Sequence, residues 1–138
     1  MLSFIEPVEP FEDLDGDQLP DPWEVQYFGA TNVTDDATFD SDGDGLSNGE
    51  EYIADTDPDD GGDIPVLMIE STSDATVSQL MFDTSDQRMY HIDFRSSVET
   101  GSWSTAVFEF LGAGGMMTIP RTNAVEAIGY YRLGVELP

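Results

Sequence analysis

Two stretches of this chain repeat one spacing of acidic and glycine residues at an offset of 27 residues. They read DLDGDQLPDPWE, from Asp13 to Glu24, and DSDGDGLSNGEE, from Asp40 to Glu51. Both place Asp at positions 1, 3 and 5, Gly at 4, Leu at 7, Asp or Asn at 9 and Glu at 12. This spacing fixes which side chains can converge, so it constrains the fold more than the average composition does.

The repeated spacing is typical of a twelve-residue calcium-binding loop. Ca²⁺ takes six to eight oxygen ligands at about 2.3–2.6 Å, and alternate side chains of a tightly curled loop point to one centre. A backbone carbonyl at position 7 adds a ligand, and Glu at position 12 closes the sphere with two oxygens. Asp and Gly also favour ordinary turns, but that alternative does not explain why both stretches end in Glu at the same place.

The two loops differ at position 6, where the backbone turns sharply. The second loop has Gly45 there and the first has Gln18, which departs from the usual glycine. A short helix is predicted after each loop, with Pro22 in the first turn of the first helix and Gly29 at its end. Pro20, at position 8, has no N–H to donate, so we expect that the loops do not pair through that position. The apolar helix positions are Trp23, Tyr27, Phe28, Tyr52 and Ile53.

The charge of the chain is very negative and unevenly distributed. Asp and Glu number 29 against four arginines and no lysine, which gives a net charge of -25. Residues 1–63 hold 20 of these acids and no arginine. Such a polyanion repels nucleic acid and anionic membranes, so we expect neither as a partner, and no apolar run is long enough for a membrane span. The absence of cysteine excludes disulfides and zinc–thiolate sites.

The stretch DLDGDQLPDPWEVQYFG … DSDGDGLSNGEEYIADTDP resembles the thrombospondin type 3 repeat-like calcium modules, with EF-hand-like loops, of bacterial secreted and surface proteins. The resemblance implies two Ca²⁺ ions and an extracellular, calcium-stabilised module. It also covers the ADTDP tail with Asp55 and Asp57. The ligands that it implies are Asp13, Asp15, Asp17, Asp21 and Glu24 with the Leu19 carbonyl, and Asp40, Asp42, Asp44, Asn48 and Glu51 with the Leu46 carbonyl. A dockerin-like module of two loop–helix units is the alternative, but its partner-binding positions, 10 and 11, differ between these repeats.

The second half of the chain predicts short antiparallel strands. Apolar residues alternate there, and the turn sequences TSD (84–86), ETGS (99–102), GAGG (112–115, read as a hairpin turn) and TNA (122–124) separate them. Six or seven such strands fit an immunoglobulin- or fibronectin-III-like β-sandwich. The run RMYHIDFRSS … GSWST … GYYRLGVEL is similar to β-rich domains that follow such calcium repeats. The alternating residues are Leu80 and Phe82; Tyr90, Ile92 and Phe94; Val107 and Leu111; and Tyr131, Leu133, Val135 and Leu137.

The chain is therefore expected to be mainly β with a small α/loop calcium unit. We predict an extended leader at 1–11, the two-site calcium unit at 12–60, a linker at 61–65 and the β-sandwich at 66–138. No catalytic group is found: His91 shares a strand face with Asp93, a pair expected to be exposed.

The predicted function is a non-enzymatic, extracellular structural or adhesion module at the C-terminus of a secreted or surface protein. Its partners would be calcium and another extracellular protein or a neighbouring domain. Trp103, near Tyr130 and Tyr131, leaves open a carbohydrate-binding sandwich, although packing of Trp103 in the sandwich or on the calcium unit is favoured.

Overall fold

The computed structural model describes residues 12–31, 36–73, 77–97, 102–122 and 129–138. The chain divides into two compact units. The first, here called the loop unit, comprises Met1–Tyr52 and Asp57–Gly61, and the second, the β unit, comprises Ile53–Thr56 and Gly62–Pro138. None of the described helices is long and apolar enough to cross a membrane.

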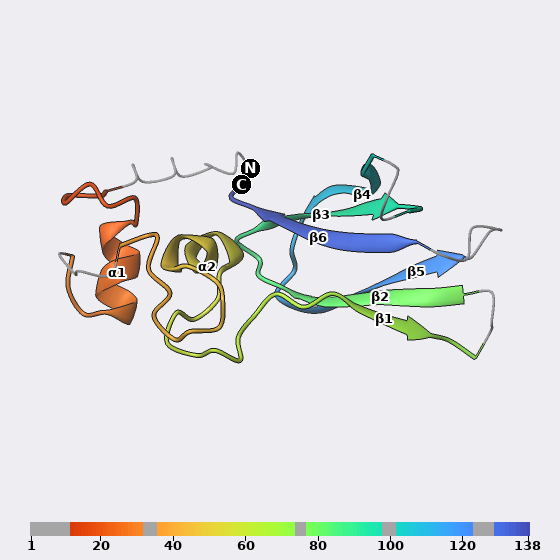
Figure 1. The fold of residues 1–138 in the computed structure, drawn as a ribbon, viewed down its shortest axis with the longest axis horizontal. Coiled ribbons are helices and arrows are strands. Elements are labelled where there is room, and N and C mark those ends of the chain that lie inside the picture. The colour runs from red at the N-terminus through yellow and green to blue at the C-terminus, as the bar shows by residue number, and fades with distance from the viewer. Residues whose placement is uncertain (1–11, 32–35, 74–76, 98–101, 123–128) are drawn as a thin grey trace, which may run out of the picture. The chain divides into compact units, whose positions relative to one another are not determined.

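The described residues confirm a mainly β chain with antiparallel sheets and two helices (Figure 1). The elements in chain order are α1 (Asp21–Tyr27), α2 (Asn48–Ala54), β1 (Met68–Ser71), β2 (Val77–Thr84), β3 (Met89–Arg95), β4 (Ser104–Leu111), β5 (Gly115–Thr122) and β6 (Tyr130–Glu136).

Both helices begin inside the repeated loops, at position 9, which places Glu at position 12 on the first turn. Helix α1 follows Pro20 and carries Pro22 in its first turn, where a missing N–H costs nothing. Its last turn closes when the N–H groups of Phe28 and Gly29 donate to the Glu24 carbonyl, at 2.7 and 3.1 Å. Gly29 has φ +76°, so it ends the helix as predicted.

A small aromatic cluster holds the loop unit together. The Trp23 side chain is buried, and its ring centroid lies 4.9 Å from that of Tyr27 and 5.5 Å from that of Phe28. The Tyr52 ring, from α2, meets Trp23 edge-on at 6.0 Å. Leu19 and Pro58 are also completely buried. The unit therefore has an apolar centre despite its many acids.

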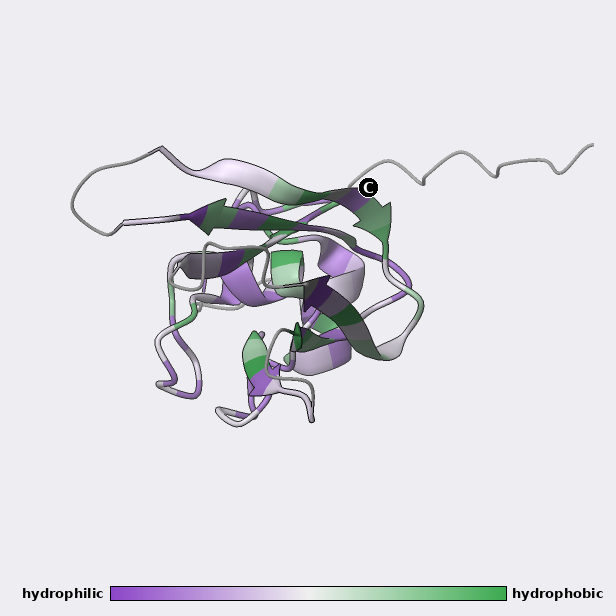
Figure 2. Cartoon of the chain, turned by 90° about the vertical axis from the view of Figure 1, so that its right-hand side faces the viewer, coloured by the Kyte–Doolittle hydropathy of each residue, from purple (hydrophilic) through white to green (hydrophobic). Residues whose placement is uncertain are grey.

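Within the β unit, the described strands form two three-stranded antiparallel sheets, in the orders β1-β2-β5 and β4-β3-β6 (Figure 1). Hydrophobic and hydrophilic residues alternate along the strands (Figure 2). The fully or nearly fully buried core residues Leu80, Phe82, Tyr90 and Ile92 lie on the central strands β2 and β3. Side chains from β4, β5 and β6 pack against them, so both sheets contribute to one core.

Two details of the predicted strands are wrong. The Gly112–Gly115 segment joins β4 to β5, which lie in different sheets, so it is not a hairpin turn. Leu111 does not share the inward face of Val107: register shifts in the β3–β4 pairing turn Phe110 to the core and leave Leu111 55 % exposed. A bulge changes which face each later residue takes, and alternation alone cannot reveal it. Of the predicted turns, residues 99–101 and 123–124 lie outside the described residues.

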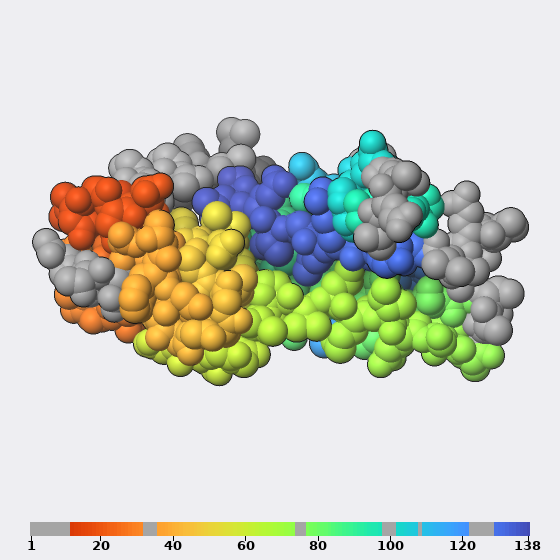
Figure 3. All heavy atoms as spheres, in the orientation of Figure 1, coloured from red at the N-terminus to blue at the C-terminus, as the bar shows by residue number. Residues whose placement is uncertain are grey.

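Strand β1 is the most exposed of the described strands. It pairs with β2 in antiparallel register, with Met68 opposite Met81 and Ile69 opposite Leu80. All four of its residues are exposed, and Ile69 keeps 55 % of its surface. The yellow-green residues of this region lie at the surface in Figure 3. Among the described strands, β2 is its partner on one side and the other edge is open.

Candidate metal centres

The carboxylate at position 1 shapes each loop. In the first loop, Oδ1 of Asp13 accepts hydrogen bonds from the N–H groups of Gly16 (2.7 Å) and Asp17 (3.2 Å), and Oδ2 accepts one from Gln18 (3.1 Å). In the second loop, the Asp40 carboxylate accepts from Gly43 (2.7 Å) and Gly45 (3.1 Å). The same positions, 4 and 6, donate in both loops. The carboxylate at position 1 therefore stabilises the tight turn of each loop through hydrogen bonds to the backbone.

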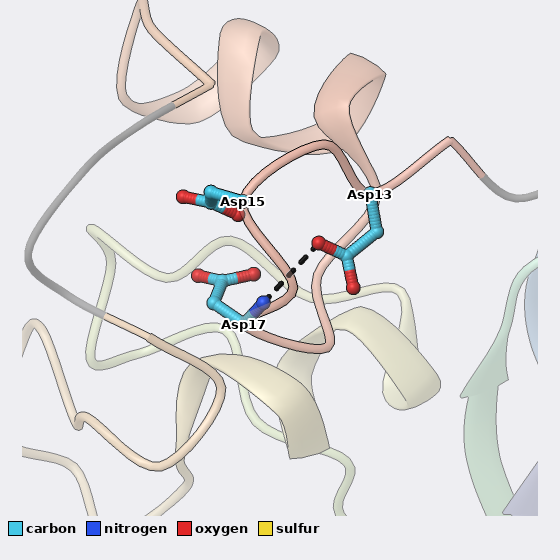
Figure 4. A group of neighbouring side chains, drawn as sticks. All are labelled: Asp13, Asp15 and Asp17. Atoms are coloured by element: carbon cyan, nitrogen blue, oxygen red, sulfur yellow. Dashed lines mark hydrogen bonds between the residues drawn. The ribbon is translucent and has the colours of Figure 1, made fainter.

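The aspartates at positions 1, 3 and 5 come together in each loop, and Figure 4 shows those of the first loop. Their carboxylate oxygens lie within 4.8 Å of one another, both in Asp13, Asp15 and Asp17 and in Asp40, Asp42 and Asp44. These two groups, found among the described residues, can each hold a metal ion. Within the described part of the chain, Oδ2 of Asp17, Asp42 and Asp44 is buried and accepts no hydrogen bond.

The glutamates at position 12 are buried completely. Glu24 and Glu51 each have 0 % relative exposure, which is unusual for a carboxylate. Neither carboxylate oxygen of Glu24 accepts a hydrogen bond from the described residues. Burial first, and then the negative charges of Asp17, Asp15 and the other loop aspartates, raise the pKa of Glu24 to about 7. The ionised form of Glu24 is therefore destabilised by burial and by the neighbouring negative charges, and a bound cation would relieve both effects.

The residues at positions 7 and 9 hold the loops closed. Oδ1 of Asp21 accepts from the Leu14 N–H at 2.9 Å, and Oδ1 of Asn48 accepts from the Ser41 hydroxyl at 2.8 Å. Both links join position 2 to position 9. The N–H of Leu19 donates to Asp17, as the N–H of Leu46 does to Asp44. Asp21 and Asn48, which the sequence predicts as ligands, thus accept hydrogen bonds within their own loops. The groups of carboxylates that come close enough to hold a metal ion consist of the residues at positions 1, 3 and 5.

The backbone at positions 4 and 6 is left-handed in both loops. Gly16 and Gly43 have φ +78° and +82°, and Gly45 has φ +105°. Gln18 takes the same region with φ +80°, although it has a Cβ. The departure seen in the sequence is therefore accommodated by backbone strain rather than by a different turn.

A turn at residues 57–61 lies against the second loop, and none of its residues is among the predicted ligands. A Cβ on Gly61 would lie 3.4 Å from the Cβ of Asp44 and 3.7 Å from the carboxyl carbon of Asp42, so the 57–61 turn packs against the second loop. The turn closes when the Asp57 carbonyl accepts from the Asp60 N–H at 3.0 Å. The Asp-Pro-Asp-Asp-Gly sequence signals a turn, but nothing local in it indicates what it packs on.

The polar residues singled out in the β unit form a different arrangement. Asp93 is buried rather than exposed, because Arg132 binds its Oδ2 through Nε (2.9 Å) and Nη2 (2.8 Å). The His91 Nδ1 lies 3.5 Å from the Glu136 carboxylate. An open groove of about 470 Å³ is lined by His91, Asp93, Thr105, Glu109 and Glu136.

Trp103 is partly exposed and does not belong to the described hydrophobic core of the β unit. The guanidinium carbons of Arg95 and Arg132 lie 4.7 and 4.5 Å from its ring centroid. These distances are typical of cation–π contacts, so arginines cover part of the surface that a sugar ring would need.

No protein-family model matches this chain, and comparison with curated proteins and with solved structures found no match.

Proposed function

We propose that the chain is a calcium-binding module in which each loop holds one Ca²⁺ ion and the ions stabilise the loop unit. The observation that carries this proposal is Glu24. Its carboxylate has 0 % exposure, accepts no hydrogen bond from the described residues and faces the loop aspartates. Burying an unpaired carboxylate is costly unless a cation or a donor compensates it. A Ca²⁺ ion bound to Glu24 and Asp13, Asp15 and Asp17 supplies that compensation.

The chemistry of the donors favours Ca²⁺ over other common ions. The expected ligands are carboxylates, one side-chain amide and the carbonyls of Leu19 and Leu46, which are all hard oxygen donors. Zinc and copper sites generally include imidazole or thiolate, which the loops lack. Mg²⁺ requires a near-octahedral shell at about 2.0–2.1 Å and keeps several waters, whereas a twelve-residue loop suits the larger and more flexible sphere of Ca²⁺.

The charge distribution makes the metal part of the fold. Residues 1–63 carry 20 acids and no arginine, so their mutual repulsion opposes compaction. The ligands must be brought together before the ion can bind to all of them, and the free energy of binding then contributes to folding.

The β unit supports a structural role for the module. Two antiparallel sheets that share one core are consistent with a small immunoglobulin- or fibronectin-III-like sandwich. We propose that the whole is an extracellular structural or adhesion module, because Ca²⁺ is abundant outside cells and extracellular calcium modules work at about 10⁻⁴–10⁻³ M. A dockerin-like docking module and a carbohydrate-binding sandwich are the alternatives.

The test is calcium binding by titration calorimetry with matched charge-neutralising variants. The wild-type chain should bind two Ca²⁺ ions. Glu24→Gln and Glu51→Gln should each abolish one binding event. Glu12→Gln removes the same charge from an exposed residue just before the first loop and should leave both events intact.

A melting experiment gives a second readout. Removal of Ca²⁺ with EDTA should lower the melting temperature of the loop unit strongly, and Mg²⁺ should restore little of it. A chain that binds no calcium, or whose melting is unchanged by EDTA, contradicts the proposal.

A further inference from the structure

The glutamates that close the two loops lie next to aromatic residues that touch each other. Trp23 directly precedes Glu24 on α1, and Tyr52 directly follows Glu51 on α2. The two ring centroids are 6.0 Å apart with an interplanar angle of 70°. Trp23 is only 8 % exposed, and its ring also contacts Tyr27 on its own helix. The ring contact between α1 and α2 therefore connects the helix that carries Glu24 to the helix that carries Glu51.

We propose that the Trp23–Tyr52 contact couples the two metal sites, so that filling one loop tightens Ca²⁺ binding to the other. The proposal rests on the proposed function, namely that both loops bind Ca²⁺. Trp23 and Tyr52 are positioning residues in it, since they act through Glu24 and Glu51.

The helices are too short to be stable by themselves, which is why a contact between them matters. Each has seven residues, whereas isolated helices shorter than about 12–15 residues are marginal in water. An ion bound to Glu51 holds the first turn of α2 and with it Tyr52. The Tyr52 ring then supports Trp23 and the first turn of α1, so Glu24 is already placed for the second ion. Whichever site fills first, the other needs less ordering.

Charge acts in the opposite direction. The first Ca²⁺ reduces the negative potential of the loop unit and thereby weakens the attraction for the second. Salt screens this effect over about 8–10 Å at ordinary ionic strength, but it does not screen a packed ring contact. The ring coupling should therefore persist, or become more evident, when the salt concentration is raised.

The experiment follows site 1 through Trp23 in a Trp103→Phe background, which leaves Trp23 as the single tryptophan. Ca²⁺ is titrated with site 2 intact and with site 2 disabled by Asp42→Ala. We expect site 1 to bind about fivefold more tightly when site 2 can fill, as is typical of modest coupling between sites.

The variants separate coupling from general damage. Tyr52→Ala should remove the difference between the two titrations, and Tyr52→Phe, which keeps the ring, should preserve it. Tyr27→Ala is the matched control, because it also removes a ring contact of Trp23, but within α1. If Tyr52→Ala does not fold by circular dichroism, Tyr52→Leu replaces it, since leucine keeps apolar volume without an aromatic ring and is compatible with a helix.

The outcomes distinguish this proposal from the proposed function. No Ca²⁺ binding by calorimetry in the unmodified chain overturns both. Two binding events with equal site 1 affinity in the presence and absence of Asp42→Ala overturn the coupling alone. A fivefold difference that survives Tyr52→Ala shows that the coupling takes another route and overturns the role of the rings.

Discussion

Gln18 adopts a left-handed backbone conformation, and the equivalent position of the second loop is the glycine Gly45. Its φ of +80° lies in the left-handed region, where Gly45 has +105°. A residue with a Cβ is disfavoured there by about 1 kcal/mol relative to glycine. The side chain of Gln18 is exposed, so no buried contact offsets this cost.

We predict that Gln18→Gly tightens Ca²⁺ binding at site 1 severalfold and leaves site 2 almost unchanged. A relief of about 1 kcal/mol corresponds to about fivefold in affinity. Site 1 is isolated with Asp42→Ala and titrated calorimetrically with and without the glycine. Gln18→Ala is the control, since alanine keeps the strain and should bind like the parent. Equal or weaker binding by the glycine variant would mean that Gln18 is unstrained or contributes a ligand.

Asp93 makes the stability of the β unit depend on pH in the acidic range. The hydrogen bond from Arg132 is the main cause that lowers the pKa of this carboxyl, and nearby His91 contributes more weakly. A carboxyl whose pKa is lower in the folded than in the unfolded state stabilises the fold above its unfolded pKa, about 3.9. This contribution is lost as the pH falls through the folded pKa.

We therefore expect Arg132→Met to lower the melting temperature of the β unit at pH 7 but to have less effect at pH 2. Calorimetric melting of both proteins between pH 2 and pH 7 measures the difference. Arg121→Met is the control, because Arg121 contacts the Tyr131 ring instead of Asp93, and its effect should not depend on pH in this range. Parallel curves for wild type and Arg132→Met would contradict the assignment.

At the scale of elements, Arg88 in the β2–β3 turn binds the Ile53–Thr56 segment, which includes the end of α2 and belongs to the β unit. Its side chain is only 9 % exposed. Nε donates to the Ile53 carbonyl at 2.9 Å, and Nη2 lies 3.3 Å from Oδ1 of Asp55. Ile53 lies in the last turn of α2, where carbonyls have no partner within the helix. Asp55 takes φ +62°, and the Ser85 hydroxyl also binds its carboxylate.

We predict that Arg88→Met destabilises the β unit by about 2 kcal/mol, because a buried, charged hydrogen-bonding group is lost and its partners remain. Chemical denaturation followed by circular dichroism measures the change. Arg88→Lys keeps the charge but not the planar guanidinium, so its stability should lie between that of the parent and that of Arg88→Met. A variant as stable as the parent would show that solvent satisfies Ile53 and Asp55 equally well.

The sequence predicts well those elements that are determined by residues close together in the chain. The spacing of Asp, Gly and Glu defines both loops, and the apolar residues after Glu24 and Glu51 indicate the two helices. Contacts over longer distances leave no such trace. Neither the bulge that exposes Leu111 nor the burial of Asp93 by Arg132, 39 residues away, can be read from alternation. The position of Gly61 against the second loop also depends on tertiary packing.

For the whole molecule, the division of the chain leads to a prediction about fragments. The β unit contains Ile53–Thr56 in addition to Gly62–Pro138. A fragment of residues 64–138 has a formal charge of only -5, with its own core, and should fold. A fragment of residues 53–138 should have a higher denaturation midpoint, because it retains the partners of Arg88. Circular dichroism of both fragments measures this; equal midpoints would contradict it, and an unfolded 64–138 fragment would show a single integrated core.

The open edge of β1 has a consequence for how the protein behaves in concentrated solution. A strand whose outer edge pairs with no other described strand, and which carries Met68 and Ile69 on its surface, is a template for strand addition between molecules. Long-range repulsion between chains of net charge -25 opposes such contacts. That protection depends on acidity. As the pH approaches the isoelectric point of about 4.1, colloidal repulsion vanishes while the edge remains, and the protein should precipitate.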